Sequence, residues 1–324
     1  MIILTIQNMT RTQTKEETMS KQAEKIQAVA DKIVALMEEH GTNWTKPWAS
    51  KVAEGFPVNV ASKKTYQGIN SFWLGMEAWD KGYSSNVWGT YKQWTAAGGV
   101  VPKGATTVFF WKPLDVDAKG HDGSVLKNDK GEVIKKKIWM LKTYSVWNRD
   151  QITGLEDDAQ PVVTADPEFH ADQVEAFVNN TGAKVNHGGG RAYYSPAGDY
   201  IQMPNKKDFV GTKTSTAEEA YYSTLLHELV HWTGGKGRID RTKGKMFGDA
   251  DYAFEELVAE TGAATLSVLL GVSPEPRPDH AQYLNNWLKA IKDNPKAVFT
   301  AFTQANKAVE FLYNKQPQTE EAAA

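Results

Sequence analysis

The pentapeptide His227-Glu228-Leu229-Val230-His231 has the residue types and the spacing of a catalytic metal site. On a helix, residues four positions apart face the same side, so both imidazoles can bind one ion. Glu228 directly follows the first histidine and can reach a water molecule on that ion without binding the ion itself. The pattern therefore predicts His227 and His231 as metal ligands and Glu228 as the general base of a metal-dependent peptidase.

A third protein ligand must come from another element, because two histidines fill only part of a tetrahedral shell. The chain has no cysteine, so this ligand is a carboxylate or a histidine. Within the helical pattern of residues 252–264, Glu256 and Glu260 share one face. We expect Glu256 to bind the metal and Glu260 to orient a histidine through its other ring nitrogen, while Glu255, about 100° around the helix, points elsewhere. Two imidazoles and one carboxylate suit Zn²⁺ and tolerate Mn²⁺, Co²⁺ or Ni²⁺.

Other polar residues in this half are weaker candidates. His187 and His280 are of a kind that is more often solvated or capping than ligating, and they are not assigned to the site. Tyr194, Tyr222 or Tyr283 could stabilise a developing oxyanion, and the sequence does not choose among them.

The histidine motif must lie on a helix, and its surroundings predict one over residues 216–233. Thr216 followed by Glu219 is a capping-box pattern, and Gly234-Gly235 supplies a stop. The rest of this half is predicted to be mainly helical with a small β-hairpin. The expected helices cover residues 169–179, 250–270, 278–292 and 295–313, and the expected strands cover 193–194 and 200–204.

The first half of the chain is both basic and aromatic. Residues 19–150 carry 19 Lys and Arg against 13 Asp and Glu, whereas residues 151–324 carry 16 against 24. Nine of the 11 tryptophans also precede residue 150. Single-stranded DNA is held by cations that follow its phosphates and by aromatic rings that stack on its unpaired bases. The candidate DNA-binding residues are Lys64, Tyr66, Trp73, Trp88, Tyr91, Lys92, Trp94, Trp111 and Lys112.

A second interpretation of these aromatic residues stays open. Tryptophans also build the cores of small domains while lysines cover their surfaces, and for any single aromatic residue composition favours that role.

A length of 324 residues exceeds what one core usually holds and predicts two domains. We expect an α+β domain over residues 19–153, a linker over 154–167 and a mainly helical domain over 168–315, so the fold class is α+β. In the first domain, helices are expected over 20–40, 71–79 and 87–95, and strands over 108–111 and 137–147, with a Gly-, Asp- and Lys-rich hairpin or loop over 115–136.

Composition also bears on the compartment. The absence of cysteine fits a reducing cytoplasm, and no stretch is apolar for long enough to span a bilayer. Residues 1–18 are expected to be a polar extension, with Met19 as a candidate start.

Seven segments taken together are more specific than the histidine motif alone. They are Tyr66 to Asn70, Trp88 to Trp94, Gly98 to Gly104, Val146 to Gln151, Tyr200 to Pro204, His227 to Gly234 and Tyr252 to Glu260. In this combination the chain resembles the ArdC-type antirestriction proteins of conjugative plasmids over nearly all of residues 20–313. The segment 115–136 is longer than the corresponding part of the family pattern.

The resemblance implies an N-terminal domain that binds single-stranded DNA and a C-terminal zincin-like metallopeptidase domain. It also implies action in the cytoplasm of a conjugation recipient, where restriction enzymes would cut the entering DNA. The protein substrate is open, with components of the host restriction system as candidates.

Two classes of function are compatible with the sequence. In the first, the chain is an enzyme that binds single-stranded DNA and cleaves a protein. In the second, it coats DNA without catalysis, and its metal site is structural or vestigial. Glu228 favours the enzyme, because a structural metal site needs no base beside it.

Overall fold

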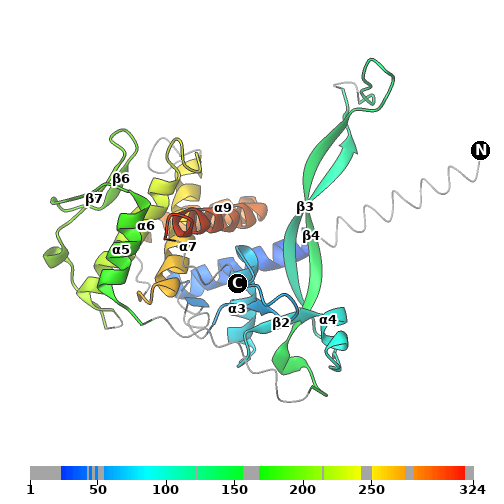
Figure 1. The fold of residues 1–324 in the computed structure, drawn as a ribbon, viewed down its shortest axis with the longest axis horizontal. Coiled ribbons are helices and arrows are strands. Elements are labelled where there is room, and N and C mark those ends of the chain that lie inside the picture. The colour runs from blue at the N-terminus through cyan, green and yellow to red at the C-terminus, as the bar shows by residue number, and fades with distance from the viewer. Residues whose placement is uncertain are drawn as a thin grey trace, which may run out of the picture.

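The first half is built on a four-stranded sheet with the strand order β1-β2-β4-β3 (Figure 1). The computed structural model describes residues 23–41, 44–45, 48–49, 55–120, 123–155, 168–213, 215–241, 250–273 and 281–317. The strands are β1 (Val58–Asn59), β2 (Val87–Thr90), β3 (Thr106–Asp117) and β4 (Lys135–Asn148). Around them lie a helix over residues 23–40, α3 (Ile69–Asp80), α4 (Tyr91–Ala96) and the short 3₁₀ helix η2 (Arg149–Gln151).

Strands β3 and β4 form a long antiparallel hairpin that projects from the body of the molecule (Figure 1). Its register runs from Thr106 opposite Val146 to Asp117 opposite Lys135. The two strands predicted from β-branched and aromatic residues are thus confirmed, and both extend into the segment 115–136 that was expected to be a hairpin or loop.

The prediction of one helix over residues 87–95 is wrong. Val87 to Thr90 form strand β2, and a helix begins only at Tyr91. Thr90 ends the strand and caps α4, since its hydroxyl accepts the Gln93 amide and the Gln93 side chain accepts the Thr90 amide. Gly89 permits this junction, because a Cβ there would lie 2.6 Å from Val60 and 2.9 Å from Trp94.

The second half is mainly helical, as predicted. Its helices are α5 (Ala171–Thr181), α6 (Ala217–Thr233), α7 (Ala250–Leu269), α8 (Ala281–Asp293) and α9 (Lys296–Tyr313), with the 3₁₀ helix η3 (Lys206–Asp208). A three-stranded sheet in the order β5-β7-β6 contains the predicted hairpin, formed by β6 (Tyr193–Ser195) and β7 (Tyr200–Met203), and an unpredicted parallel strand, β5 (Val185–His187). No helix in the described part of the chain is long and apolar enough to cross a membrane.

The two halves share one hydrophobic core. Phe72 of α3 lies 4.9 Å from Phe302 of α9, and Phe109 of β3 lies 4.8 Å from Phe299, both measured between ring centroids. The Gly68 amide donates to the Asn306 side chain at 3.2 Å. Helix α9 therefore completes the core of the first half, although most of the linker predicted between the halves, residues 156–167, lies outside the described residues.

Substitutions at a buried and at an exposed residue of α4 should differ in their effect on the free energy of unfolding. Trp94 is fully buried, and its indole nitrogen donates to the Trp147 carbonyl at 2.9 Å, whereas Tyr91 is 57% exposed. We expect Trp94→Ala to lower the free energy of unfolding by about 3–5 kcal/mol, and Tyr91→Ala to change it by less than about 1 kcal/mol. Denaturant unfolding of both variants measures the difference. Equal losses in the two variants would show that Trp94 does not act as a core residue.

Candidate metal centre and nucleic-acid face

The histidine motif lies on α6, whose start is fixed by the predicted capping box. The Thr216 hydroxyl accepts the Glu219 amide at 3.1 Å, and the Glu219 carboxylate accepts the Thr216 amide at 2.8 Å. From this start the helix runs through the motif and ends at Thr233. His227 and His231 are consequently one turn apart and buried on the side that faces α7.

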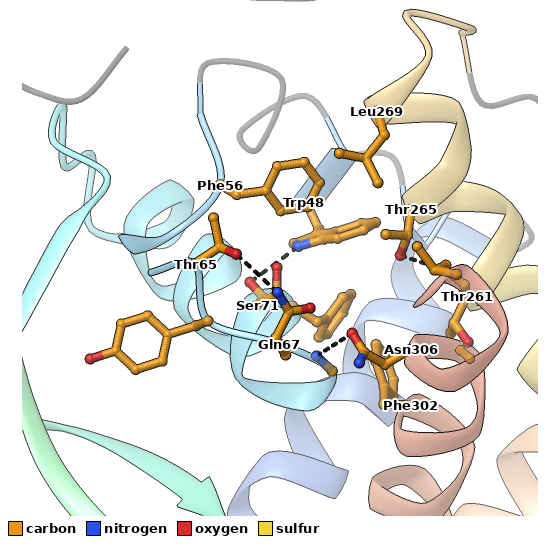
Figure 2. Close-up of a pocket in the computed structure, with 15 residues that line it drawn as sticks. Trp48, Phe56, Thr65, Gln67, Ser71, Thr261, Thr265, Leu269, Phe302 and Asn306 are labelled. Carbon is orange, nitrogen blue, oxygen red and sulfur yellow. Dashed lines mark hydrogen bonds between the residues drawn. The ribbon is translucent and has the colours of Figure 1, made fainter. Parts of the chain in front are cut away.

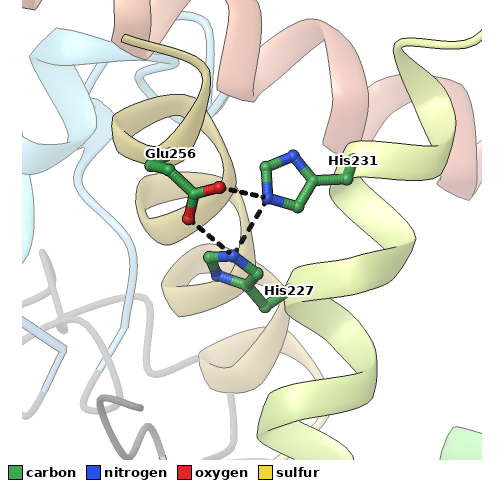
Figure 3. A group of neighbouring side chains, drawn as sticks. All are labelled: His227, His231 and Glu256. Atoms are coloured by element: carbon green, nitrogen blue, oxygen red, sulfur yellow. Dashed lines mark hydrogen bonds and ion pairs between the residues drawn. The ribbon is translucent and has the colours of Figure 1, made fainter. Parts of the chain in front are cut away.

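The Glu256 carboxylate of α7 faces both imidazoles (Figure 3). The two Nε2 atoms of His227 and His231 are 3.1 Å apart. One Glu256 carboxylate oxygen lies 3.4 Å from His227 Nε2, and the other lies 3.3 Å from His231 Nε2. Ligands at about 2.0–2.1 Å from a tetrahedral metal are about 3.3 Å from one another. The three predicted ligands therefore have the spacing of a metal site.

Two further carboxylates of α7 lie behind the imidazoles. Glu260 has a carboxylate oxygen 3.9 Å from His227 Nδ1, which is beyond hydrogen-bond distance, so its role in orienting that histidine stays a prediction. The expectation that Glu255 points elsewhere is wrong, because its carboxylate lies 3.2 Å from His231 Nδ1. The Arg241 guanidinium holds Glu255 through contacts of 2.7 and 3.0 Å. Glu255 is thus the carboxylate that orients His231 through the ring nitrogen opposite Nε2, as a metal ligand needs.

Burial and charge act in opposite directions on these groups. Burial alone would lower the pKa of His231, but the charge of Glu256 and the hydrogen bonds that the imidazole donates to Glu255 and Glu256 raise it to about 9. Burial alone would raise the pKa of Glu255, but hydrogen bonds from His231 and Arg241 lower it to about 2. The two histidines likewise hold the pKa of Glu256 well below its usual range against the effect of burial. His231 would therefore have to give up a proton to bind a metal ion.

Glu228 is buried on α6 beside the ligands, and its charge contributes to the raised pKa of His231. The structure does not assign a role in stabilising an oxyanion to any of the candidate tyrosines. Tyr194 donates to Asp199 at 2.8 Å, Tyr222 donates to Glu175 at 2.9 Å, and the side chain of Tyr283 lies outside the described part. His187 contacts the Tyr221 hydroxyl at 2.8 Å, and His280 also falls outside the described residues.

The candidate DNA-binding residues fall into several groups. Trp88 and Trp94 have no exposed surface, which corrects their assignment, because a fully buried ring cannot stack on a base. Trp73 is half-buried against the shared core, and Tyr66 is half-buried with its hydroxyl 3.1 Å from the Asn59 amide nitrogen. The exposed members are Tyr91, Lys64, Lys92 and Lys112, and the side chain of Trp111 lies outside the described residues.

An aromatic pair on the projecting hairpin was missed by the sequence reasoning. Phe110 and Tyr144 stack with ring centroids 4.5 Å apart and planes within 9°, and Tyr144 is 55% exposed. Because paired residues share a face and the face repeats every second residue, Lys112 and Lys142 lie on the same face as these rings. Only the strand register brings the four residues together, and the sequence does not state that register.

Family models match both halves of the chain. Residues 23–147 match the model described as the N-terminal domain of anti-restriction factor ArdC, and residues 172–304 match the model described as a zincin-like metallopeptidase. The matched ranges lie within the two predicted domains.

Solved structures of one relative are similar over most of the chain. The metal-free crystal structure of the antirestriction ArdC protein from plasmid R388 is 36% identical with a TM-score of 0.69, and the match covers 90% of this chain and 97% of that one. The Mn(II)-bound structure of that protein is 35% identical with a TM-score of 0.67 and the same coverage.

Two curated proteins are also similar. The uncharacterized protein y4eC of Sinorhizobium fredii (strain NBRC 101917 / NGR234) is 36% identical over 292 residues, which cover 89% of this chain and 91% of that protein. The DNA primase TraC of Escherichia coli is 33% identical over 318 residues, which cover 95% of this chain but only 21% of TraC. The chain therefore corresponds to a minor part of that longer protein.

The arrangement predicts a graded loss of metal affinity. His227→Ala and Glu256→Ala should abolish tight Zn²⁺ binding, because each removes a ligand atom. Glu255→Gln and Glu260→Gln should weaken binding by about 10–100-fold, because each leaves the ligands in place but loosens a histidine. Calorimetric titration and metal analysis after dialysis measure the effects. Parental affinity in Glu256→Ala together with complete loss in Glu255→Gln would show that Glu255 is the ligand.

Proposed function

Because the chain belongs to the ArdC antirestriction family, we propose that it binds single-stranded DNA and cleaves a protein at a zinc site, protecting DNA that enters a conjugation recipient. The observation that carries the enzymatic part is the group of His227, His231 and Glu256 with Glu228 beside it. The proposal places this activity in the cytoplasm, where restriction enzymes meet entering DNA. A component of the host restriction system is the proposed protein substrate.

The donor set fits a zinc-type ion. Two imidazole nitrogens and a carboxylate at mutual distances of 3.1 to 3.4 Å suit Zn²⁺ and also Mn²⁺, Co²⁺ or Ni²⁺. When bound, such an ion polarises a peptide carbonyl and makes water a stronger acid. Glu228 then accepts the proton of the attacking water on its carboxylate and passes it to the leaving amine. Glu255 and Glu260 hold the imidazoles in orientation through the reaction.

The alternative is a protein that coats DNA and has no peptidase activity. A structural metal site requires the three ligands and their supporting carboxylates, but it does not require Glu228. Glu228 is buried beside the ligands and directly follows the first histidine, where a general base can reach a water on the ion, and this favours the enzyme.

The peptidase proposal is tested by separating metal binding from hydrolysis. Glu228→Gln should bind Zn²⁺ as the parent does, while cleavage of casein or of a purified restriction enzyme should fall by about 10²–10⁴-fold, because only the base is lost. Assays with and without single-stranded DNA show whether DNA stimulates cleavage. If neither substrate is cut under any of these conditions, or if Glu228→Gln cuts as fast as the parent, the coating protein becomes the better account.

The hairpin supplies the surface on which we propose that DNA lies. Tyr144 offers an exposed ring face, Phe110 supports it from behind, and Lys112 and Lys142 are within the reach of one strand's phosphates on the same face. Exposed Tyr91 and Lys92 on α4 and Lys64 near β1 are further contacts in this proposal.

Tyr144→Ala should weaken the binding of a single-stranded oligonucleotide by about 5–100-fold, because a stacked base contributes about 1–3 kcal/mol. Lys112→Gln should reduce the slope of log affinity against log salt by about 0.7. Fluorescence anisotropy across a salt series measures both effects, and binding should survive chelation of metal. Tyr193→Ala, at an exposed tyrosine of the second half, is the matched control. Equal affinities of the Tyr144 and Tyr193 variants would exclude the hairpin as the stacking surface.

A further inference from the structure

A small pocket lies at the seam where the first half meets α7 and α9 (Figure 2). Trp48, Phe56 and the start of α3 form its first side, and Leu269 of α7 with Phe302 of α9 form the other. Its cavity volume is about 110 Å³. The residues at its mouth, Thr65 and Gln67, are exposed and joined by a side-chain hydrogen bond of 2.9 Å.

The wall of this seam pocket contains a polar group that nothing in the described structure satisfies. Ser71 is only 7% exposed, and its hydroxyl has no hydrogen-bond partner among the described residues. Its carbonyl, in contrast, accepts the Trp48 indole N–H at 3.3 Å. A buried hydroxyl without a partner destabilises a fold, so one that lines a pocket indicates a ligand that completes it.

The chemistry of the lining indicates what kind of ligand fits. None of the described residues that line the pocket is charged; they offer aromatic rings, the Gln67 amide and hydroxyl groups. Such a site suits a neutral flat ring with hydrogen-bonding groups on its edge. The volume is below the roughly 150 Å³ cavity that encloses benzene, so a single ring with one edge at the mouth fits better than a double ring.

Charge at the mouth indicates what the ring is attached to. Lys63 and Lys64 are exposed and directly precede Thr65. Their two ammonium groups can contact phosphates, so the pocket suits a base whose sugar and phosphates stay outside the pocket. In addition, Asn70 at the start of α3 exchanges hydrogen bonds with the backbone of Phe109, the residue before the stacking ring of Phe110. Asn70 therefore ties the start of α3, which lines the pocket, to the base of the hairpin.

We propose that the seam pocket takes one pyrimidine base of a single DNA strand, with the Ser71 hydroxyl bonded to the edge of the base and the adjoining phosphates near Lys63 and Lys64. The inference rests on the proposed binding of single-stranded DNA and extends it to a site shared by both halves. A base in a duplex cannot enter without leaving its stack and its partner, so the pocket also selects single strands.

The experiment uses the full chain and oligonucleotides of about 12 nucleotides in which every base is missing except one central base. The parent should bind the oligonucleotide with one thymine about tenfold more tightly than the fully abasic one. We call this increase in affinity the gain from thymine, and one adenine should give a smaller gain. Ser71→Ala should reduce the gain from thymine by about threefold to tenfold. Its melting temperature should not fall, because the hydroxyl has no partner among the described residues.

Two further variants complete the test. Ser267→Ala is the matched control, since the hydroxyl of Ser267 is also buried without a described partner but does not line the pocket, and it should keep the full gain. Ala305→Leu narrows the pocket from α9 and should remove the gain. Photocrosslinking of a single 5-iodouracil base should label Trp48 or Phe56.

The outcomes separate the two proposals. If the parent binds none of the oligonucleotides and no natural single strand, the proposed DNA binding is wrong and the pocket proposal falls with it. If the parent binds and the gain from thymine is as large in Ser71→Ala as in Ser267→Ala, the pocket takes no base although DNA binding stands. A gain from adenine that equals the gain from thymine overturns the preference for one ring.

Discussion

The close approach of α7 to α6 is the constraint on which the metal centre depends. The histidines come from α6 and the carboxylates come from α7, so the two helix axes must be near enough for a glutamate to reach an imidazole. Gly262 permits this distance, because a Cβ at that position would lie 3.0 Å from both methyl carbons of Val230. Buried Ala259 and Ala263 beside it keep the contact narrow. A side chain at residue 262 would separate the helices and move all three carboxylates away from the histidines together.

Helix α7 is held in turn from its other side. The Trp287 indole of α8 donates to the Ala253 carbonyl at 2.9 Å, three residues before the ligand Glu256. Helix α9 packs on α7 and also carries Phe299 and Phe302, which contact the first half. Helix α7, which carries Glu256, and the candidate DNA-binding half therefore both pack against α9. Their stabilities are coupled through α9, even though the sequence divides the chain into a basic part and an acidic part.

The sequence predicted the site well where the information is local to one helix. His227 and His231 lie at helical spacing, and Thr216 with Glu219 fixes the start of that helix. The prediction for Glu255 was wrong, because the direction of its side chain around α7 was compared with that of Glu256 alone. His231 lies a full turn beyond His227, and its Nδ1 points toward Glu255 of α7. Arg241 also binds Glu255, a contact that no local sequence pattern predicts.

Prediction failed differently for the aromatic residues of the first half. The same composition serves a core and a stacking surface, and only the register of β2, β3 and β4 decides between them. Trp88 pairs with Asn148 in the middle of the sheet and packs against residues of α3, while Tyr144 of the hairpin is 55% exposed. The fold class and nearly all helices could be predicted, since their periodicity is local. The strand from Val87 to Thr90 could not, since its pairing partner is distant in sequence.

The charge of the buried cluster connects the fold to its proposed chemistry. Glu228, Glu255, Glu256 and Glu260 are all buried within one region, where the described cations are Arg241 and protonated His231. With all four carboxylates ionised, the cluster keeps an excess of two negative charges, and burying an excess charge is costly. A divalent cation at the three ligands would reduce that excess from two negative charges to one, even with His231 neutral. Replacing the carboxylates by apolar residues would relieve the same cost without a metal, so the presence of four buried carboxylates favours a role in cation binding.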